Sequence, residues 1–252
     1  MKKVNSDVAY DYIRKRILSG EYPPGFSLMT EVLAVETGVS RTPVREALHK
    51  LKADGLVSIR ARLGASVKKV DVKEFREMCE LRLALEGHAA GLAAVNHSQA
   101  DLREIKFALD AMRSFTERIN AAHQERPLLD EMLQEDVRFH IAIMTAAKND
   151  LMKKEILRLH LVNRIVLGPI NSAAGTPVPL VAKSESDANR RKVFASHDEI
   201  YEAIARSDAG AAKQAMENHI QDIIEKSLRA MSQAGGGLIA RELTAEELSY
   251  TA

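Results

Sequence analysis

A ten-residue stretch, residues 39–48, constrains the fold of this chain more than any other part of its sequence. It predicts a helix that begins after Ser40, because serine is a good N-cap, and Pro43 then lies in the first turn, where its missing backbone N–H removes no hydrogen bond. Apolar residues recur at helical spacing and should face a core: Val44, Leu48 and Leu51. Polar residues near the helix start project away from that core: Arg41, Thr42 and Arg45. The stretch therefore predicts a helix that is buried on one side and cationic on the other, as a DNA-reading helix is.

The residues on either side of this helix complete a helix-turn-helix pattern. Residues 33–39 predict a short preceding helix that is closed by Gly38. Residues 54–55 end the second helix, and residues 56–70 alternate apolar and polar side chains around Gly64, as a two-stranded ribbon does. Four basic side chains lie in this ribbon: Arg60, Arg62, Lys68 and Lys69. The pattern predicts a positively charged β-wing next to the helix-turn-helix.

Three separated blocks carry a more specific signal: residues 17–25, 38–48 and 55–57. In this order they make residues 8–70 resemble the winged helix-turn-helix of the GntR superfamily of bacterial transcription regulators. The resemblance implies that the start of the second helix meets operator DNA and that Gly64 lets the wing approach the DNA backbone or minor groove. The DNA-binding residues expected on this basis are Ser40, Arg41, Thr42, Pro43, Arg45, Arg60, Arg62 and Gly64.

The first helix of the motif departs from part of this family. Glu31 occupies a position at which some relatives carry a DNA-contacting arginine. The resemblance therefore does not extend a DNA contact to this position.

The charge of the chain is divided between its two parts. Residues 1–70 hold 13 Lys and Arg against 7 Asp and Glu, whereas residues 71–252 hold 23 against 28. A basic head on an acidic body is the electrostatic footprint of a phosphate-binding module attached to a body that does not bind DNA. The alternative is that the helix start is an ordinary solvated cap, but the division of charge favours the DNA-binding interpretation.

Length and composition predict more than one domain. The chain has 252 residues and a hydrophobic fraction of 46%, which can fill two cores. We expect a winged helix-turn-helix domain over residues 1–70, an all-helical effector and dimerisation domain over residues 71–234, and a flexible tail over residues 235–252, in which Thr244 and Glu247 could cap a short helix. No apolar run approaches the ~20 residues that a membrane span needs, so a cytoplasmic protein without membrane contact is expected.

From Asp71 onward the pattern predicts helices and no strand. The expected spans are residues 72–95, 99–124, 127–147, 149–168, 186–207 and 209–232. Residues 169–185 are rich in Pro, Gly and Ser and should form a long loop, either a lid or plain surface. Cys79 is the single cysteine, which excludes an intramolecular disulfide and predicts a small buried side chain. The fold class is therefore mainly α: a winged helix-turn-helix with a small β-wing, followed by an all-α helical bundle.

The predicted bundle carries a second group of functional residue types. Asp136 and His140 stand four residues apart, so they share one helical face and form half of a metal site. His197 and His219 lie on later helices, among apolar neighbours that should face the bundle interior. Four helices could thus meet around one cavity lined by these residues, and bundle cores are where such sites are built. Taken singly, each histidine could instead be an ordinary hydrogen-bonded core or surface residue.

These motifs, together with residues 80–90, resemble FCD, the all-helical effector domain of fatty-acid regulators that follows the same head in the FadR/FCD branch of the GntR superfamily. The resemblance covers residues 72–232. It implies a divalent metal held by the carboxylate and the three histidines just named, a small carboxylate effector, and Arg82 as the partner of that carboxylate. Such a donor set suits Zn²⁺, with Ni²⁺ or another borderline ion as alternatives. Arg82 could instead form a salt bridge with Glu80 or Glu86 on its own helix.

The sequence as a whole predicts a ligand-responsive transcription regulator. A homodimer would present two heads to a palindromic operator, and an effector bound beside the metal would change the relation of body and heads. A metal-dependent hydrolase is the rival class, because an open metal position could activate water. The sequence offers that class no dedicated general base, Gly-rich phosphate loop, nucleophile elbow or His-Glu-x-x-His motif. A regulator with a purely structural metal site is the second alternative.

Overall fold

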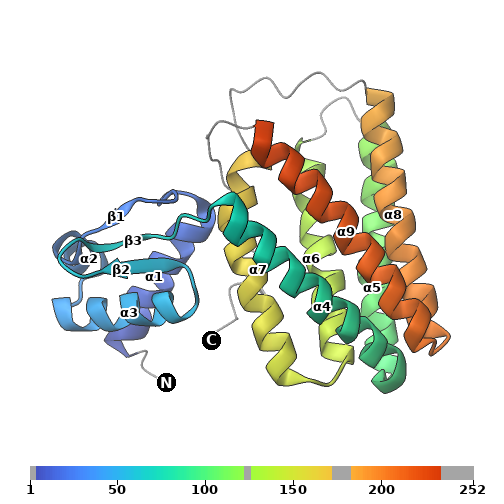
Figure 1. Cartoon of the computed structure of the whole chain (residues 1–252), viewed down its shortest axis with the longest axis horizontal. Helices are drawn as coiled ribbons and strands as arrows, with labels where there is room; N and C mark the ends of the chain where they lie inside the picture. The colour runs from blue at the N-terminus through green and yellow to red at the C-terminus, as the bar shows by residue number, and fades with distance from the viewer. Residues whose placement is uncertain (1–3, 122–125, 172–182, 234–252) are drawn as a thin grey trace. The chain divides into compact units, whose positions relative to one another are not determined.

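The computed structural model describes residues 4–121, 126–171 and 183–233 of the chain (Figure 1). These residues fall into two compact units. The first holds the sequence up to Phe75 and takes in further chain from Arg158 and from Ala230, while the second holds Arg76–Leu157 and the later sequence up to Arg229. The units are discontinuous in sequence, whereas the expected domains were consecutive, and the boundaries of those domains stay predictions.

The first unit contains the predicted helix-turn-helix and wing. Its elements are α1 (Asn5–Ser19), β1 (Ser27–Leu28), α2 (Thr30–Thr37), α3 (Arg41–Ala53), β2 (Val57–Arg60) and β3 (Gly64–Val67). The strands form an antiparallel sheet in the order β1-β3-β2, in which Val57 pairs with Val67 and Ser27 pairs with Ser66. The predicted two-stranded ribbon is therefore present with a third strand added, and β1 is too short to leave an alternating pattern in the sequence.

The turn between α2 and α3 follows from its backbone. Gly38 ends α2 with a φ of +69°, in the left-handed region that glycine enters without a steric penalty. Ser40 then occupies the N-cap position of α3 in an extended conformation, although its side chain makes no capping hydrogen bond within the described part of the chain. The inner face of α3 buries the residues that its spacing predicted: Val44, Leu48 and Leu51.

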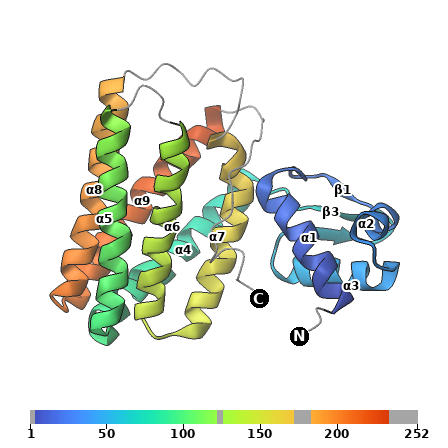
Figure 2. The same ribbon diagram turned by 180° about the vertical axis from the view of Figure 1, so that it is seen from behind.

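The rest of the described chain is helical, as the sequence predicted. The elements are α4 (Val72–Asn96), α5 (Gln99–Ala121), α6 (Arg126–Ala146), α7 (Asp150–Asn171), α8 (Lys183–Ala205) and α9 (Ala209–Gln233). In the second unit α5 packs against both α6 and α8, as the two opposite views show (Figures 1 and 2). No helix in the described ranges is both long enough and apolar enough to cross a bilayer.

The predicted loop over residues 169–185 is wrong at both of its ends. Helix α7 continues through Pro169 to Asn171, and α8 begins at Lys183. A proline removes one backbone donor and crowds the preceding turn, which penalises a helix but does not forbid a last turn. The remainder of that loop, residues 172–182, and the predicted tail over 235–252 lie outside the described residues.

Two glycines bring α4 close to α9 in the second unit. A Cβ atom on Gly87 would lie 2.6 Å from Cγ of Glu217, and one on Gly91 would lie 3.2 Å from the carbonyl oxygen of Ala209. A larger residue at position 87 would collide with the Glu217 side chain, and one at position 91 would press on the backbone of α9. Because α9 also carries His219, this close approach sets one face of α4 against the candidate site.

Candidate metal centre and nucleic-acid interface

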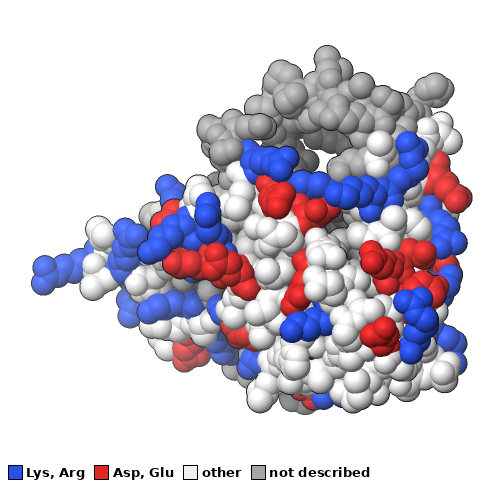
Figure 3. Space-filling model, turned by 45° about the vertical axis from the view of Figure 1, so that its right-hand side comes forward, with Lys and Arg blue, Asp and Glu red and all other residues white. Residues whose placement is uncertain are grey.

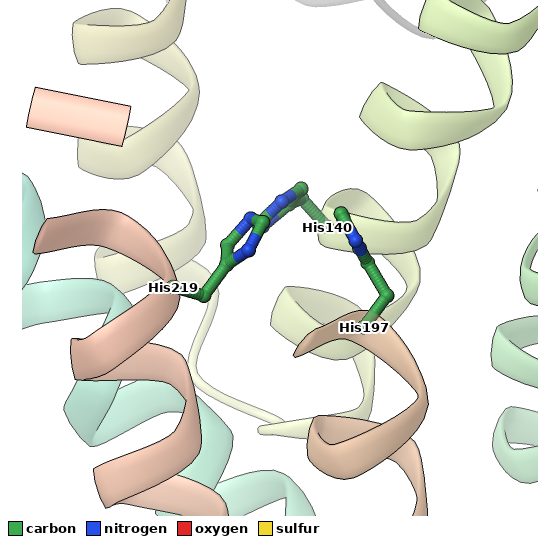
Figure 4. Close-up of side chains that lie close together, drawn as sticks. All are labelled: His140, His197 and His219. Carbon is green, nitrogen blue, oxygen red and sulfur yellow. The ribbon is translucent and has the colours of Figure 1, made fainter. Parts of the chain in front are cut away.

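Three histidines converge in the interior of the second unit, with their rings turned toward one another (Figure 4). His140 lies on α6, His197 on α8 and His219 on α9, and all three are buried. One ring nitrogen from each histidine lies within 4.8 Å of those of the other two. Two nitrogens that each bind one Zn²⁺ at about 2.0–2.1 Å lie at most roughly 4.2 Å apart, so the rings need to move only slightly closer together to bind a single ion.

Asp136 lies one helical turn before His140 on α6 and contacts a second member of the cluster. Its Oδ1 is 2.9 Å from Nε2 of His197, and its side chain remains 30% exposed. The structure thus brings together all four residues that the sequence singled out, but they come from three helices rather than four. The fourth helix at the site is α4, which contributes a residue that the sequence analysis did not place there.

That residue is Glu86. Its Oε2 lies 3.3 Å from Nδ1 of His140, and its Oε1 accepts a hydrogen bond of 2.8 Å from Nε of Arg82. All three side chains are buried. The salt bridge that was the alternative for Arg82 is therefore present, and it joins Arg82 to the histidine cluster. The i, i+4 spacing of Arg82 and Glu86 in the sequence indicates their salt bridge. It does not indicate that the other carboxylate oxygen of Glu86 contacts His140.

The hydrogen-bond partners of two rings determine which nitrogen carries the proton. Nδ1 of His197 lies 2.7 Å from the carbonyl oxygen of Val193, which can only accept, so this nitrogen is the donor. Ser196 gives its single hydroxyl proton to the same carbonyl at 2.7 Å, and its Oγ therefore accepts from Nδ1 of His219 at 2.9 Å. When either ring is neutral, its Nε2 is therefore left with a lone pair.

These two lone pairs lack a protein donor. Nε2 of His197 and Nε2 of His219 are buried, and within the described residues neither makes a hydrogen bond. An unsatisfied buried polar atom costs about 1–3 kcal/mol. A second proton on His197 would satisfy its contact with the Asp136 carboxylate, but His219 would still lack a partner. One cation among the rings satisfies both, so the donor set fits a metal ion.

The electrostatics of the site agree with that fit. Burial, followed by the charges of His197 and His140, lowers the pKa of His219 to about 2, so this ring stays neutral. Burial also disfavours a charged His140, but Glu86 and Asp136 more than offset it and raise its pKa. Burial would raise the pKa of Asp136, yet its contact with His197 holds that pKa well below its usual range. The two carboxylates thus favour positive charge in a place where His219 cannot accept a proton.

The residues expected to bind DNA lie at the surface of the first unit. Ser40, Arg41, Thr42 and Arg45 are exposed at the start of α3, Pro43 beside them is half-buried, and Arg60, Arg62 and Gly64 are exposed in the wing. Figure 3 shows Lys and Arg side chains projecting from the tip of this unit. Arg62 has a φ of +64°, an uncommon conformation for a residue with a Cβ, and it lies in the turn between β2 and β3. The structure thus presents two basic elements, one helical and one in a hairpin.

A shallow hollow of about 260 Å³ lies on the wing. Its lining combines two hydroxyls with two cations, and the residues involved are Gly25, Ser58, Arg60, Leu63, Gly64, Ser66, Val67 and Lys69. Hydroxyl and cationic donors are the groups that proteins use to hold phosphate oxygens. The sequence analysis named Arg60, Gly64 and Lys69 but missed Ser58 and Ser66, because it did not include the fold of the sheet that places them together.

Glu31 contacts one of the expected DNA-binding residues. Its Oε1 lies 3.5 Å from Nη1 of Arg41, and the two side chains are 59% and 66% exposed. If Arg41 binds DNA as expected, the carboxylate competes with DNA phosphate for its guanidinium. An exposed pair of this kind contributes about 0–1 kcal/mol.

We expect Glu31→Gln to bind operator DNA about two- to fivefold more tightly, because it removes this competitor and one negative charge facing the phosphates. Fluorescence anisotropy at fixed salt measures the change. Glu21→Gln is the matched control, since Glu21 pairs with Arg16 on α1 and is similarly exposed. Equal affinities of Glu31→Gln and the control would show that Glu31 does not act on DNA binding.

Two family models match the chain. Residues 77–222 match the FCD domain, and residues 5–67 match the bacterial regulatory proteins of the gntR family. The two matches follow one another along the sequence in the order that the residue patterns predicted. The FCD match alone covers more than half of the chain.

Curated relatives resemble the chain over most of its length. It is 29% identical over 225 residues to the HTH-type transcriptional regulator LutR of Bacillus subtilis strain 168, a match that covers 82% of this chain and 94% of the relative. It is 27% identical over 240 residues to the HTH-type transcriptional repressor RspR of Escherichia coli K12, covering 95% of each protein.

Solved structures share the fold. Escherichia coli McbR/YncC has a TM-score of 0.65 at 20% identity, over 91% of this chain and 99% of that one. A GntR transcriptional regulator from Rhodococcus sp. RHA1 has a TM-score of 0.62 at 22% identity, over 89% of this chain and 98% of that one. The predicted fold, a winged helix-turn-helix followed by an FCD bundle, is confirmed.

Proposed function

This chain belongs to the FCD-domain branch of the bacterial GntR family, and we propose that it is a metal-containing regulator that binds a palindromic operator as a homodimer and responds to a small carboxylate. Its family is one of transcription regulators rather than enzymes. The metal, the effector, the dimer and a cytoplasmic location are the proposed parts. The observation that carries the metal proposal is the convergence of three buried histidine rings, in which Nε2 of His219 has no hydrogen-bond partner among the described residues and Nε2 of His197 faces the Asp136 carboxylate, itself a metal-ligand type.

The proposed metal ligands are Asp136, His140, His197 and His219. Three neutral imidazoles and one carboxylate suit Zn²⁺ first, and Ni²⁺ or another borderline ion as alternatives. A bound divalent ion would supply positive charge and open coordination positions for the oxygen atoms of a ligand. The protein residues fix the ring orientations, through Val193, Ser196 and Glu86, before any ligand arrives.

The proposed DNA interface consists of the exposed start of α3 and the wing. Arg41 and Arg45 stand four residues apart on one helical face and can reach base edges or phosphates from the major groove. Arg60 and the two serines of the wing hollow supply donors for phosphate oxygens. The dimer would place two such interfaces on the two halves of a palindrome.

The proposed effector is a small carboxylate that binds Arg82 and the metal together. An isolated anion is prohibitively costly to bury, so a carboxylate entering this bundle must meet positive groups. Arg82 already donates to Glu86 through Nε, and a guanidinium has five N–H donors, so it can serve a second carboxylate as well.

Arg82→Lys should therefore weaken acid binding although it conserves charge, because an ammonium group cannot form the bidentate pair that a guanidinium forms. Thermal-shift screening of mono- and dicarboxylates checks this against wild type, metal-stripped protein and Arg113→Lys, a control at an exposed pair with Asp198. We expect stabilisation of wild type and the control, and a smaller shift in the other two. If no acid stabilises wild type, or all four forms respond equally, the metal is structural and this site is not an acid sensor.

A further inference from the structure

Glu86 is a buried carboxylate outside the proposed ligand set, yet it contacts one of the ligands. Its side chain is 1% exposed, and its two oxygens face different partners, Arg82 at 2.8 Å and His140 at 3.3 Å. Burying a carboxylate is unfavourable unless strong partners compensate for the lost water. Arg82 compensates one oxygen of the buried carboxylate, and the ring of His140 lies against the other.

The contact between Glu86 and His140 depends on the proton on that ring. A carboxylate only accepts hydrogen bonds, so the contact with Nδ1 is favourable when that nitrogen carries the proton. Nε2 of His140 then has the lone pair that a metal requires. Val193 and Ser196 impose the same arrangement on His197 and His219 through their own Nδ1 atoms. Each of the three rings therefore has an oxygen atom next to Nδ1: His197 and His219 are hydrogen-bonded there, and the charged Glu86 lies 3.3 Å from His140.

We propose that Glu86 is a positioning residue of the metal centre. It holds the ring of His140 in the tautomer and orientation that present Nε2, and its negative charge makes that nitrogen a stronger donor to the metal. Arg82 holds the other oxygen and so keeps the carboxylate in place. This proposal rests on the metal centre proposed above and adds to it a residue from α4, a helix that contributes no ligand.

The test is the affinity of the full-length protein for Zn²⁺, measured by competition with a chromophoric chelator. Glu86→Gln keeps the shape of the side chain but removes its charge, and we expect it to bind Zn²⁺ about 10–100-fold more weakly than wild type, still with one ion per chain at saturation. Glu86→Asp keeps the charge but is one methylene shorter, and we expect a smaller loss. Asp101→Asn is the control, because Asp101 is a 13% exposed carboxylate paired with Lys148 in the same unit.

The readouts separate positioning from the alternatives. The absorption spectrum of bound Co²⁺ should keep the wild-type coordination number in Glu86→Gln, whereas a changed coordination number would make Glu86 a ligand and overturn the positioning role. Unchanged Zn²⁺ affinity in Glu86→Gln would also overturn it, as would an equal loss in Asp101→Asn. Should Glu86→Gln fail to fold, Glu86→Asp decides by the same measurements. A wild type that binds no Zn²⁺ would instead remove the metal centre itself.

Discussion

Purified His197→Ala/His219→Ala protein should contain no stoichiometric metal and should keep its helical fold. The two substitutions remove both of the buried Nε2 lone pairs that lack a donor within the described residues. Asp136 and His140 remain, but two ligands on one helix do not make a closed site for a borderline ion. The helices should persist because the core between them is apolar, as the buried cluster of Ala89, Met144, Ala147 and Ile156 illustrates.

Elemental analysis and far-UV circular dichroism decide this prediction. The matched control is His88→Ala/His97→Ala, which removes two histidines from the same unit, one exposed and one bonded to the Ala93 carbonyl. The control should retain one metal per chain. A metal content of one per chain in His197→Ala/His219→Ala would mean that the ligands lie elsewhere.

The same variants connect the metal to stability. An ion that binds only the folded state at 100 times its Kd stabilises it by about 2.7 kcal/mol. A chelator should therefore lower the melting temperature of wild type and of the control pair of substitutions. It should leave the melting temperature of the His197→Ala/His219→Ala protein unchanged. This variant also loses two unsatisfied buried atoms, which offsets part of the cost of removing two side chains from the interior.

The sequence predicted the part of the proposed metal site that depends on local periodicity. Asp136 and His140 share a helical face because they stand four residues apart, and no tertiary information is needed to see it. Glu86 was not predicted as a site residue because its role depends on how closely α4 approaches the bundle. That approach uses Gly87 and Gly91, whose missing side chains matter only when the neighbouring helix is known.

The fold shows the same difference between features that follow from local sequence and features that depend on tertiary packing. The core face of α3 and the glycine turn at Gly38 follow from spacing and backbone conformation, and the structure has both. Strand β1 has two residues and exists because β3 offers it an edge, so no local pattern announces it. The sequence predicts that this helix ends before Pro169, but the cost of one lost hydrogen bond does not stop α7 before Asn171.

Arg41→Ala/Arg45→Ala should bind the operator far more weakly than wild type. A contact to a base edge from the start of α3 contributes about 1–3 kcal/mol, so the loss of two such contacts should weaken binding roughly 30-fold or more. The single substitutions should differ, because Arg41 must leave Glu31 to reach DNA. Wild-type binding already includes the cost of breaking that pair, so the net contribution of Arg41 is smaller. We therefore expect Arg45→Ala to lose more affinity than Arg41→Ala.

Fluorescence anisotropy at several salt concentrations both tests this prediction and identifies the kind of contact. Loss of a phosphate contact lowers the slope of log affinity against log salt by about 1, whereas loss of a base contact leaves the slope unchanged and relaxes the sequence preference. Lys50→Ala/Lys52→Ala removes the same charge from the far end of the same helix, where both side chains are exposed. If this control loses as much affinity as the arginine variant, net charge alone drives binding and the start of α3 does not read the operator. Wild-type affinity in the arginine variant would place the DNA interface on another surface.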